Sequence, residues 1–265
     1  SRDPQIKATS LALINRIVHI PPRPLKITTF KELKIQKGQT IITTGELRAR
    51  RAGELLVFLL LSPTHTRSVD EIMDTLWPNP EKRYDSFNPV YHTTTTLRKL
   101  LEPGLPDKFT SRYLDVSGGM VRFMLPPGST IDFIEAEKFV HAARWEDALE
   151  ICQEEWLPEY RYAPWSSHHR EEMLLMLLHV RLALAENWLA GQQPYRSLIT
   201  CRRILAVEPW NEKAALLGMK ACLALGDGAL AARMYRALLR SLKEEFGTQP
   251  QAELTALFRS ISTRP

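Results

Sequence analysis

The chain has 265 residues, of which 44% are hydrophobic and 25% are charged, and its formal net charge is +5. This length and apolar content suit one large domain or two ordinary ones, each with its own hydrophobic core, and we expect two. The longest uninterrupted apolar run, Leu55–Leu61, has seven residues, whereas a membrane-spanning helix needs roughly 18 or more, so no membrane-spanning segment is expected.

The positive charge is concentrated in the first half of the chain. Residues 1–128 contain 19 Lys and Arg against 12 Asp and Glu, a net of +7, and residues 129–265 contain 16 against 18, a net of −2. This asymmetry predicts a polyanion-binding part followed by a protein-facing part. Ordinary solvated surface charge is the alternative.

The N-terminal residues carry no secretory signal, because SRDPQIKATS is polar and mixed. Since the chain opens without methionine and PPRP at residues 21–24 is a stiff spacer, residues 1–24 are expected to be an extension or upstream linker. Three isolated cysteines without a C-x-x-C pair fit a reducing compartment. The expected location is the cytoplasm.

A small antiparallel sheet is predicted next, with a turn at Lys37 and Gly38, from three β-rich runs at Leu25–Phe30, Leu33–Ile35 and Thr40–Thr43. A buried helix is then predicted over Arg48–Leu61. It begins with Arg48, Arg50 and Arg51, and helix N-termini favour anions. We therefore interpret these arginines as a phosphate contact, with a solvated turn as the alternative.

Two further helices follow in this half. Ser68 is expected to cap a short one, VDEIMDTLW, with Glu71 completing a capping box. The other reads NPVYHTTTTLRKLL, with Asn88 at the N-cap position and Pro89 at the first helical position. One side of it carries Val90, Leu97, Leu100 and Leu101, and the other carries His92, Thr95, Thr96 and Lys99.

The polar side of this helix is predicted to enter a DNA groove, because short hydroxyl side chains can contact phosphates and thymine methyl groups. Tyr91 and Arg98 lie on its flanks, and Asn88 lies at its start. After the helix, RYLDVSGGMVRFML predicts a hairpin that turns at Gly118-Gly119. Arg112 and Arg122 on this hairpin are predicted to lie near phosphates.

Strand patterns vanish after Leu125–Phe133, and helices are expected from there onward. The predicted helices are Asp132–Ala143, Trp145–Glu155, Trp165–Ala190, Tyr195–Val207, Asn211–Leu225, Gly228–Phe246 and Gln251–Ser260. Two stretches echo each other and place Gly191 and Gly226 35 residues apart, close to the period of tetratricopeptide repeats. The second half is therefore predicted to be all-α and tetratricopeptide-like.

The first half resembles a known family of regulators. A sheet, three helices and a hairpin form the element order of OmpR/PhoB-type winged-helix domains. RARRAGELLVFLLLSPTHTRSVDEIMDTLWP followed by SFNPVYHTTTTLRKLL resembles the DNA-binding half of SARP-type (antibiotic regulatory protein) transcriptional activators. Thr95 and Thr96 occupy positions where relatives often have arginine.

The second half resembles the module that follows the winged helix in that family, the bacterial transcriptional activator domain. The matching segments are WEDAL at Trp145–Leu149, WLPEYRYAPW at Trp156–Trp165, GDGALAARMYRAL at Gly226–Leu238 and EFGTQP at Glu245–Pro250. We therefore expect an α+β winged-helix domain over residues 25–126 and an all-α activator domain over residues 130–262.

Enzyme chemistry has no support in the sequence. It contains no Walker-type phosphate loop, dinucleotide-binding motif or G-x-S-x-G elbow. His168, His169, Glu171 and Glu172 lie close together in sequence, but without partner cysteines or a third spaced ligand a metal site is not expected. Neither a cofactor nor a metal is predicted.

These observations predict a sequence-specific DNA-binding transcriptional activator. The resemblance implies double-stranded DNA and RNA polymerase as partners, and it allows a homodimer and an upstream regulatory domain. The alternative is a tetratricopeptide-like scaffold or ligand sensor whose winged helix no longer binds DNA.

Overall fold

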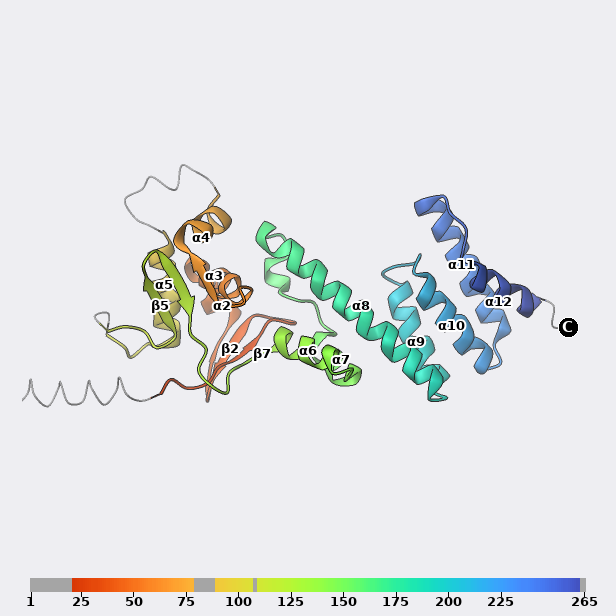
Figure 1. The fold of residues 1–265 in the computed structure, drawn as a ribbon, viewed down its shortest axis with the longest axis horizontal. Helices are drawn as coiled ribbons and strands as arrows, with labels where there is room; N and C mark the ends of the chain where they lie inside the picture. The colour runs from red at the N-terminus through yellow and green to blue at the C-terminus, as the bar shows by residue number, and fades with distance from the viewer. Residues whose placement is uncertain (1–20, 79–88, 107–108, 263–265) are drawn as a thin grey trace, which may run out of the picture. The chain divides into compact units, whose positions relative to one another are not determined.

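The computed structural model describes residues 21–78, 89–106 and 109–262, which form two compact units (Figure 1). The first unit contains the described residues up to Ile134 together with Glu154–Arg170. The second contains Glu135–Gln153 and the described residues from Glu171 onward. An α+β unit thus precedes an all-α unit, as the sequence predicted.

A four-stranded sheet of order β3-β2-β1-β7 lies in the first unit. Ile27 pairs with Ile35 and Ile131, and Ile35 pairs with Ile42. All four are buried, so one row of isoleucines forms the core face of the sheet. The strands are β1 (Lys26–Thr28), β2 (Lys34–Lys37), β3 (Thr40–Ile42) and β7 (Thr130–Ile131). Sequence reasoning missed β7, because two residues are too few to show an alternating pattern.

The predicted helix over Arg48–Leu61 is broken in the structure. A left-handed backbone at Arg50 (φ 47°) and Arg51 (φ 60°) interrupts it. The first unit therefore contains α2 (Thr44–Leu47), the 3-10 turn η1 (Ala49–Arg51), α3 (Ala52–Leu60), α4 (Val69–Leu76) and α5 (Pro89–Leu101). The predicted capping box of α4 is present, since Ser68 Oγ accepts from the Glu71 amide at 3.1 Å.

The predicted hairpin is also present, as part of a second sheet of order β4-β6-β5. Gly118 and Gly119 have φ values of 57° and 73°, a conformation that side chains with a Cβ rarely adopt. The strands are β4 (Thr66–Ser68), β5 (Leu114–Ser117) and β6 (Met120–Phe123).

The segment Glu154–Arg170 packs on the first sheet. The Lys31 amide donates to the Glu155 carbonyl at 2.8 Å, and the Leu157 amide donates to the Thr29 carbonyl at 2.9 Å. Two short 3-10 turns, η3 (Pro158–Tyr160) and η4 (Pro164–Ser166), follow. Residues far apart in sequence therefore complete the core of the first unit.

Each predicted C-terminal helix is confirmed, with ends shifted by a few residues. The helices are α6 (Asp132–His141), α7 (Trp145–Cys152), α8 (Ser167–Ala190), α9 (Pro194–Leu205), α10 (Glu212–Ala224), α11 (Gly228–Phe246) and α12 (Ala252–Ser262). In the second unit α10 packs between α9 and α11 (Figure 1). A Cβ at Gly218 of α10 would come within 2.4 Å of Met234 Cε and 3.3 Å of Cys201 Cβ, so a larger residue there would require the Met234 side chain to move.

The segment Pro164–Ala190, which comprises η4 and α8, is long and apolar enough to cross a membrane by length and composition alone, since it contains an 18-residue window with a mean hydropathy of 1.4. The sequence analysis predicted this helix but considered only uninterrupted apolar runs, and so it did not identify the apolar window. A single such helix is weak evidence, because the core helices of soluble proteins pass the same test.

Candidate nucleic-acid interface

Helix α5 is anchored in the core by one side and by two of its four threonines. Val90, Leu97 and Leu101 are fully buried. Thr93 is 1% exposed, and its hydroxyl lies 2.8 Å from the Arg50 carbonyl and 2.9 Å from the Pro89 carbonyl. The Thr94 side chain is buried as well, and its hydroxyl donates to the Tyr91 carbonyl at 3.0 Å.

The opposite side presents what we call the outward face of α5: Tyr91, His92, Thr95, Thr96 and Lys99. The first, third and last of these are exposed and the other two are half-buried. The Thr95 hydroxyl donates to the Tyr91 carbonyl at 2.7 Å, and the Thr96 hydroxyl donates to the His92 carbonyl at 2.9 Å. Since each hydroxyl has one donor hydrogen, these threonines offer a ligand their methyl groups and oxygen lone pairs.

The turn before α3 places Arg50 beside this face. Its carbonyl is fixed by Thr93, and its guanidinium Nη1 lies 3.3 Å from His92 Nδ1. Arg50 and Arg48 are both exposed. A cation is thus positioned at the edge of the outward face by a contact between residues 43 positions apart.

Arg51 has a different environment from Arg48 and Arg50. Its Nε and Nη2 donate to the Glu54 carboxylate at 2.7 and 2.8 Å. Its Nη1 donates to the Leu76 carbonyl, and its guanidinium stacks 5.4 Å from the centre of the Trp77 ring. The predicted arginine cluster is therefore divided, because Arg51 binds α3 and the end of α4 together.

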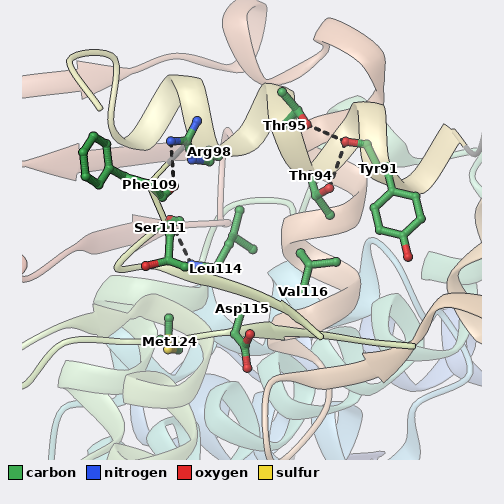
Figure 2. Close-up of a pocket in the computed structure, with 11 residues that line it drawn as sticks. Tyr91, Thr94, Thr95, Arg98, Phe109, Ser111, Leu114, Asp115, Val116 and Met124 are labelled. Carbon is green, nitrogen blue, oxygen red and sulfur yellow. Dashed lines mark hydrogen bonds between the residues drawn. The ribbon is translucent and has the colours of Figure 1, made fainter. Parts of the chain in front are cut away.

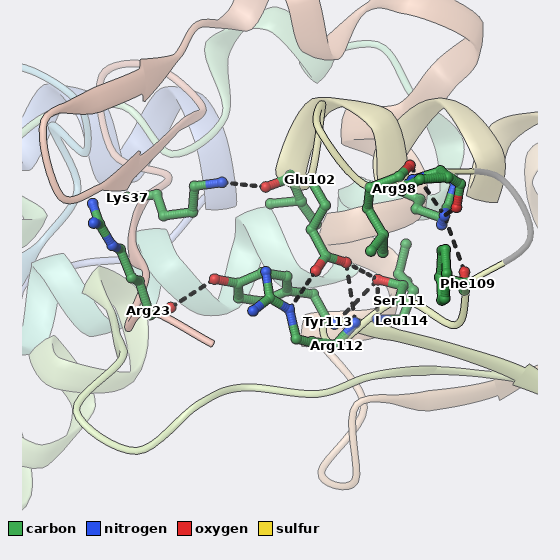
Figure 3. Close-up of polar contacts among 12 residues, drawn as sticks. Arg23, Lys37, Arg98, Glu102, Phe109, Ser111, Arg112, Tyr113 and Leu114 are labelled. Atoms are coloured by element: carbon green, nitrogen blue, oxygen red, sulfur yellow. Dashed lines mark hydrogen bonds and ion pairs between the residues drawn. The ribbon is translucent and has the colours of Figure 1, made fainter. Parts of the chain in front are cut away.

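Buried Glu102 organises the segment after α5 (Figure 3). Its side chain is 1% exposed, and it accepts from the Arg112 Nε at 2.8 Å, from the Arg112 amide at 3.0 Å and from the Ser111 hydroxyl at 2.5 Å. Lys37 donates to the Leu101 carbonyl at the end of the helix. Burial lowers the pKa of Lys37, and attraction to Glu102 opposes that shift.

Arg98 also makes intramolecular contacts. Its Nη2 donates to the carbonyls of Pro106 at 2.5 Å and Phe109 at 3.0 Å. Together with the Arg112–Glu102 pair, this contact holds Pro106 and Phe109 against the end of α5. Sequence reasoning assigned Arg98 and Arg112 to DNA and missed Glu102, for which the sequence offers no local signal.

A hollow of about 710 Å³ separates α5 from strand β5 (Figure 2). Tyr91, Thr95 and Arg98 line it from the helix, and Asp115 and Val116 line it from the strand. The β5–β6 hairpin that borders this hollow carries Arg122, whose Nε donates to the Thr66 hydroxyl at 3.2 Å. The exposed apolar residues of the hairpin are Val116 (37%) and Met120 (41%). Of the two arginines expected on the hairpin, Arg122 lies on a strand, and Arg112 precedes β5.

Asn88, the predicted N-cap of α5, lies outside the described residues. Within the described ranges, no group of three or more His, Cys, Asp or Glu could hold a metal ion. All three cysteines are buried, and burial raises the pKa of Cys152 to about 11 and that of Cys201 to about 12. These thiols are thus poor nucleophiles, since the thiolate is the reactive form.

Comparison with known proteins bears on both units. Residues 131–262 match the family model of the bacterial transcriptional activator domain. The fold is similar to that of Mycobacterium tuberculosis EmbR, solved in complex with a low-affinity phosphopeptide, with a TM-score of 0.68 and 18% sequence identity. The match covers 92% of this chain and 66% of that chain, so this chain spans just under two thirds of the other's length. No curated protein matches the sequence.

Proposed function

We propose that the chain is a SARP-type transcriptional activator and that it binds double-stranded DNA through the outward face of α5. The match of residues 131–262 to the bacterial transcriptional activator domain and the fold shared with EmbR support this assignment. In a winged helix the recognition helix lies in the major groove and the hairpin lies beside it. The order of α3, α4, α5 and the β5–β6 hairpin fits that arrangement. The regulator family is non-enzymatic, and the proposal requires no cofactor.

One observation carries the proposal: α5 turns an acid-free polar stripe outward while its other side is buried. The helix contains no Asp or Glu, and Lys99 and Tyr91 are exposed at its two ends. Thr95 and Thr96 donate their hydroxyl hydrogens to their own helix. Methyl contacts, such as those made with thymine, therefore supply the base recognition that we propose for these two threonines.

We assign the arginines and Asn88 according to their contacts. Arg48, Arg50 and Arg122 are proposed to contact phosphates, and Asn88 is kept as a proposed contact at the start of α5. Arg51, Arg98 and Arg112 are proposed to position the helix and the loop after it, because each is engaged in intramolecular hydrogen bonds. This division differs from the expectation that all six arginines face DNA.

The helical unit is proposed to support self-association and to contact RNA polymerase. We propose that the chain acts in the cytoplasm, where its DNA is located, and that an upstream regulatory domain adjusts its activity. The module that matches residues 131–262 is named for transcriptional activation, which supports a protein-facing role for this unit.

DNA binding is tested by selecting duplexes from a random library and measuring affinity by fluorescence anisotropy over a salt series. We expect Lys99→Ala to weaken binding and to reduce the salt slope by about one unit if the lysine contacts a phosphate. Thr96→Ala is expected to relax sequence preference with little change in salt slope. Lys26→Ala, an exposed lysine on β1, is the matched control.

The same titration separates the two functional hypotheses. Binding that falls steeply with salt and responds to Lys99→Ala but not to Lys26→Ala supports the regulator. Absence of salt-dependent DNA binding by the unmodified chain would instead favour the helical scaffold. Equal effects of both lysine variants would show that the outward face is not the contact surface.

A further inference from the structure

A groove between α9 and α11 is lined by apolar side chains and two arginines. Its volume is about 640 Å³. Leu205, Leu230, Met234 and Leu238 form its apolar part, with Ala206, Pro209 and Ala237. The lining contains no acidic residue. An open groove of this kind between two helices suits the apolar side of an amphipathic helix.

The two arginines of the groove, Arg202 and Arg233, come from different helices. Both are exposed, and in the parts of the chain that the structure describes neither guanidinium has an ion pair or side-chain hydrogen bond. Burial and the Asp227 carboxylate raise the pKa of Cys222, and the two positive charges of Arg202 and Arg233 oppose that shift. The nearby Asp227 carboxylate is engaged as the N-cap of α11, where it accepts from the Leu230 amide at 2.8 Å.

From this geometry we infer that the α9–α11 groove binds an acidic amphipathic helical segment of a protein partner. Leucine-sized side chains of the partner fill the apolar part, and its carboxylates pair with Arg202 and Arg233. Exposed arginines in a groove whose lining contains no acidic residue favour an anionic partner, and the apolar lining favours a peptide over a sugar–phosphate backbone. The inference rests on the proposed protein-facing role of the helical unit and is independent of DNA binding.

The test is a selection of 16-residue peptides from a display library on the full chain, followed by affinity measurements on variants. Selected peptides are expected to combine Asp or Glu with Leu, Ile or Phe. Arg202→Glu combined with Arg233→Glu should lower the affinity of the selected peptides about tenfold or more, which corresponds to the loss of one to two charge-assisted contacts. Ala237→Trp, which fills the groove without changing its charge, should also lower peptide affinity.

The matched control replaces two arginines of the same helices that do not line the groove, Arg203→Glu with Arg240→Glu. This control should leave peptide affinity within about twofold, which corresponds to less than 0.5 kcal/mol. Thermal melting of every variant verifies folding, and the substituted side chains are exposed.

Several results would overturn the inference. They are a selection without binders, binders that lack acidic residues, and binders indifferent to both groove variants. If the groove variants lower the affinity for duplex DNA and leave peptide affinity unchanged, the groove is a nucleic-acid-binding surface. If the groove variants dissociate a dimer in sedimentation experiments and the peptides do not disrupt that dimer, a second copy of the chain occupies the groove. Peptide binding by a chain that fails to bind DNA would refute the proposed DNA contact and leave this inference intact.

Discussion

The hydrogen bond from Thr93 to Arg50 predicts a specific loss of stability in Thr93→Val. Valine has nearly the same shape and a similar helix propensity, so the substitution removes the hydroxyl alone. Thr93 is 1% exposed, and its hydroxyl lies 2.8 Å from a carbonyl on the left-handed turn before α3. Loss of a hydrogen bond that leaves a partly buried carbonyl unpaired costs about 1–2 kcal/mol.

The assay is native-state hydrogen exchange in increasing urea, read on peptides from α3 and α5. Peptide resolution is needed because the chain has two units, and a single global unfolding curve would mix them. Thr95→Val is the matched control. Its hydroxyl is exposed and donates only to its own helix at the Tyr91 carbonyl, so its effect should stay within about 0.5 kcal/mol.

The comparison between these two variants decides whether the reasoning is correct. The opening free energy of α3 and α5 should fall in Thr93→Val and remain near the unmodified value in Thr95→Val. If both variants give the same opening free energy, the turn before α3 is not fixed by Thr93, and the placement of Arg50 beside the outward face loses its physical basis.

Three further predictions concern buried groups. Gly53→Ala should lower the opening free energy of α3 peptides in the same hydrogen-exchange assay by about 1–3 kcal/mol, because a Cβ there would lie 2.4 Å from the Tyr160 hydroxyl; adding Tyr160→Phe should restore part of this loss, and an additive double variant would contradict the clash. Glu102→Gln should lower the opening free energy of α5 peptides in the same hydrogen-exchange assay by roughly 1.5–3 kcal/mol by weakening its pair with Arg112; an unchanged opening free energy would show that the pair adds no stability. Cys201, with its pKa raised to about 12, should alkylate in the folded chain far more slowly than in urea at pH 8, at a rate that rises with pH; mass spectrometry showing equal rates would contradict its burial.

Local sequence patterns were sufficient for most of the fold. Helical periodicity located the C-terminal helices. Residues that begin and end helices also lie in the local sequence, as Asp227 and Gly247 do at the two ends of α11. The hairpin at Gly118-Gly119 was predictable for a similar reason, since the turn needs two residues with positive φ. Signals of this kind lie within a few residues of the structure that they specify.

The candidate site was only partly predictable because its decisive contacts are long-range. Periodicity placed Thr95 and Thr96 on the polar side of α5, but it could not show that their hydroxyls bond back to the helix. The break at Arg50 depends on Thr93, 43 positions later, and the role of Arg112 depends on a carboxylate buried after the helix ends. An arginine near a predicted interface looks the same in sequence whether it faces solvent or a buried partner.

The left-handed turn at Arg50 and Arg51 connects these contacts into one arrangement. Non-glycine residues in this conformation cost on the order of 1 kcal/mol or more each, so other contacts in the unit must stabilise them. The Glu54 carboxylate accepts hydrogen bonds from the Arg51 guanidinium and from the indole N–H of Trp165, the latter at 3.0 Å. Trp165 belongs to the stretch that matches the activator-domain family, yet it packs in the first unit. The backbone that positions Arg50 beside the outward face of α5 is therefore supported by residues from both halves of the sequence, and this support gives the two halves a physical reason to occur together in one chain.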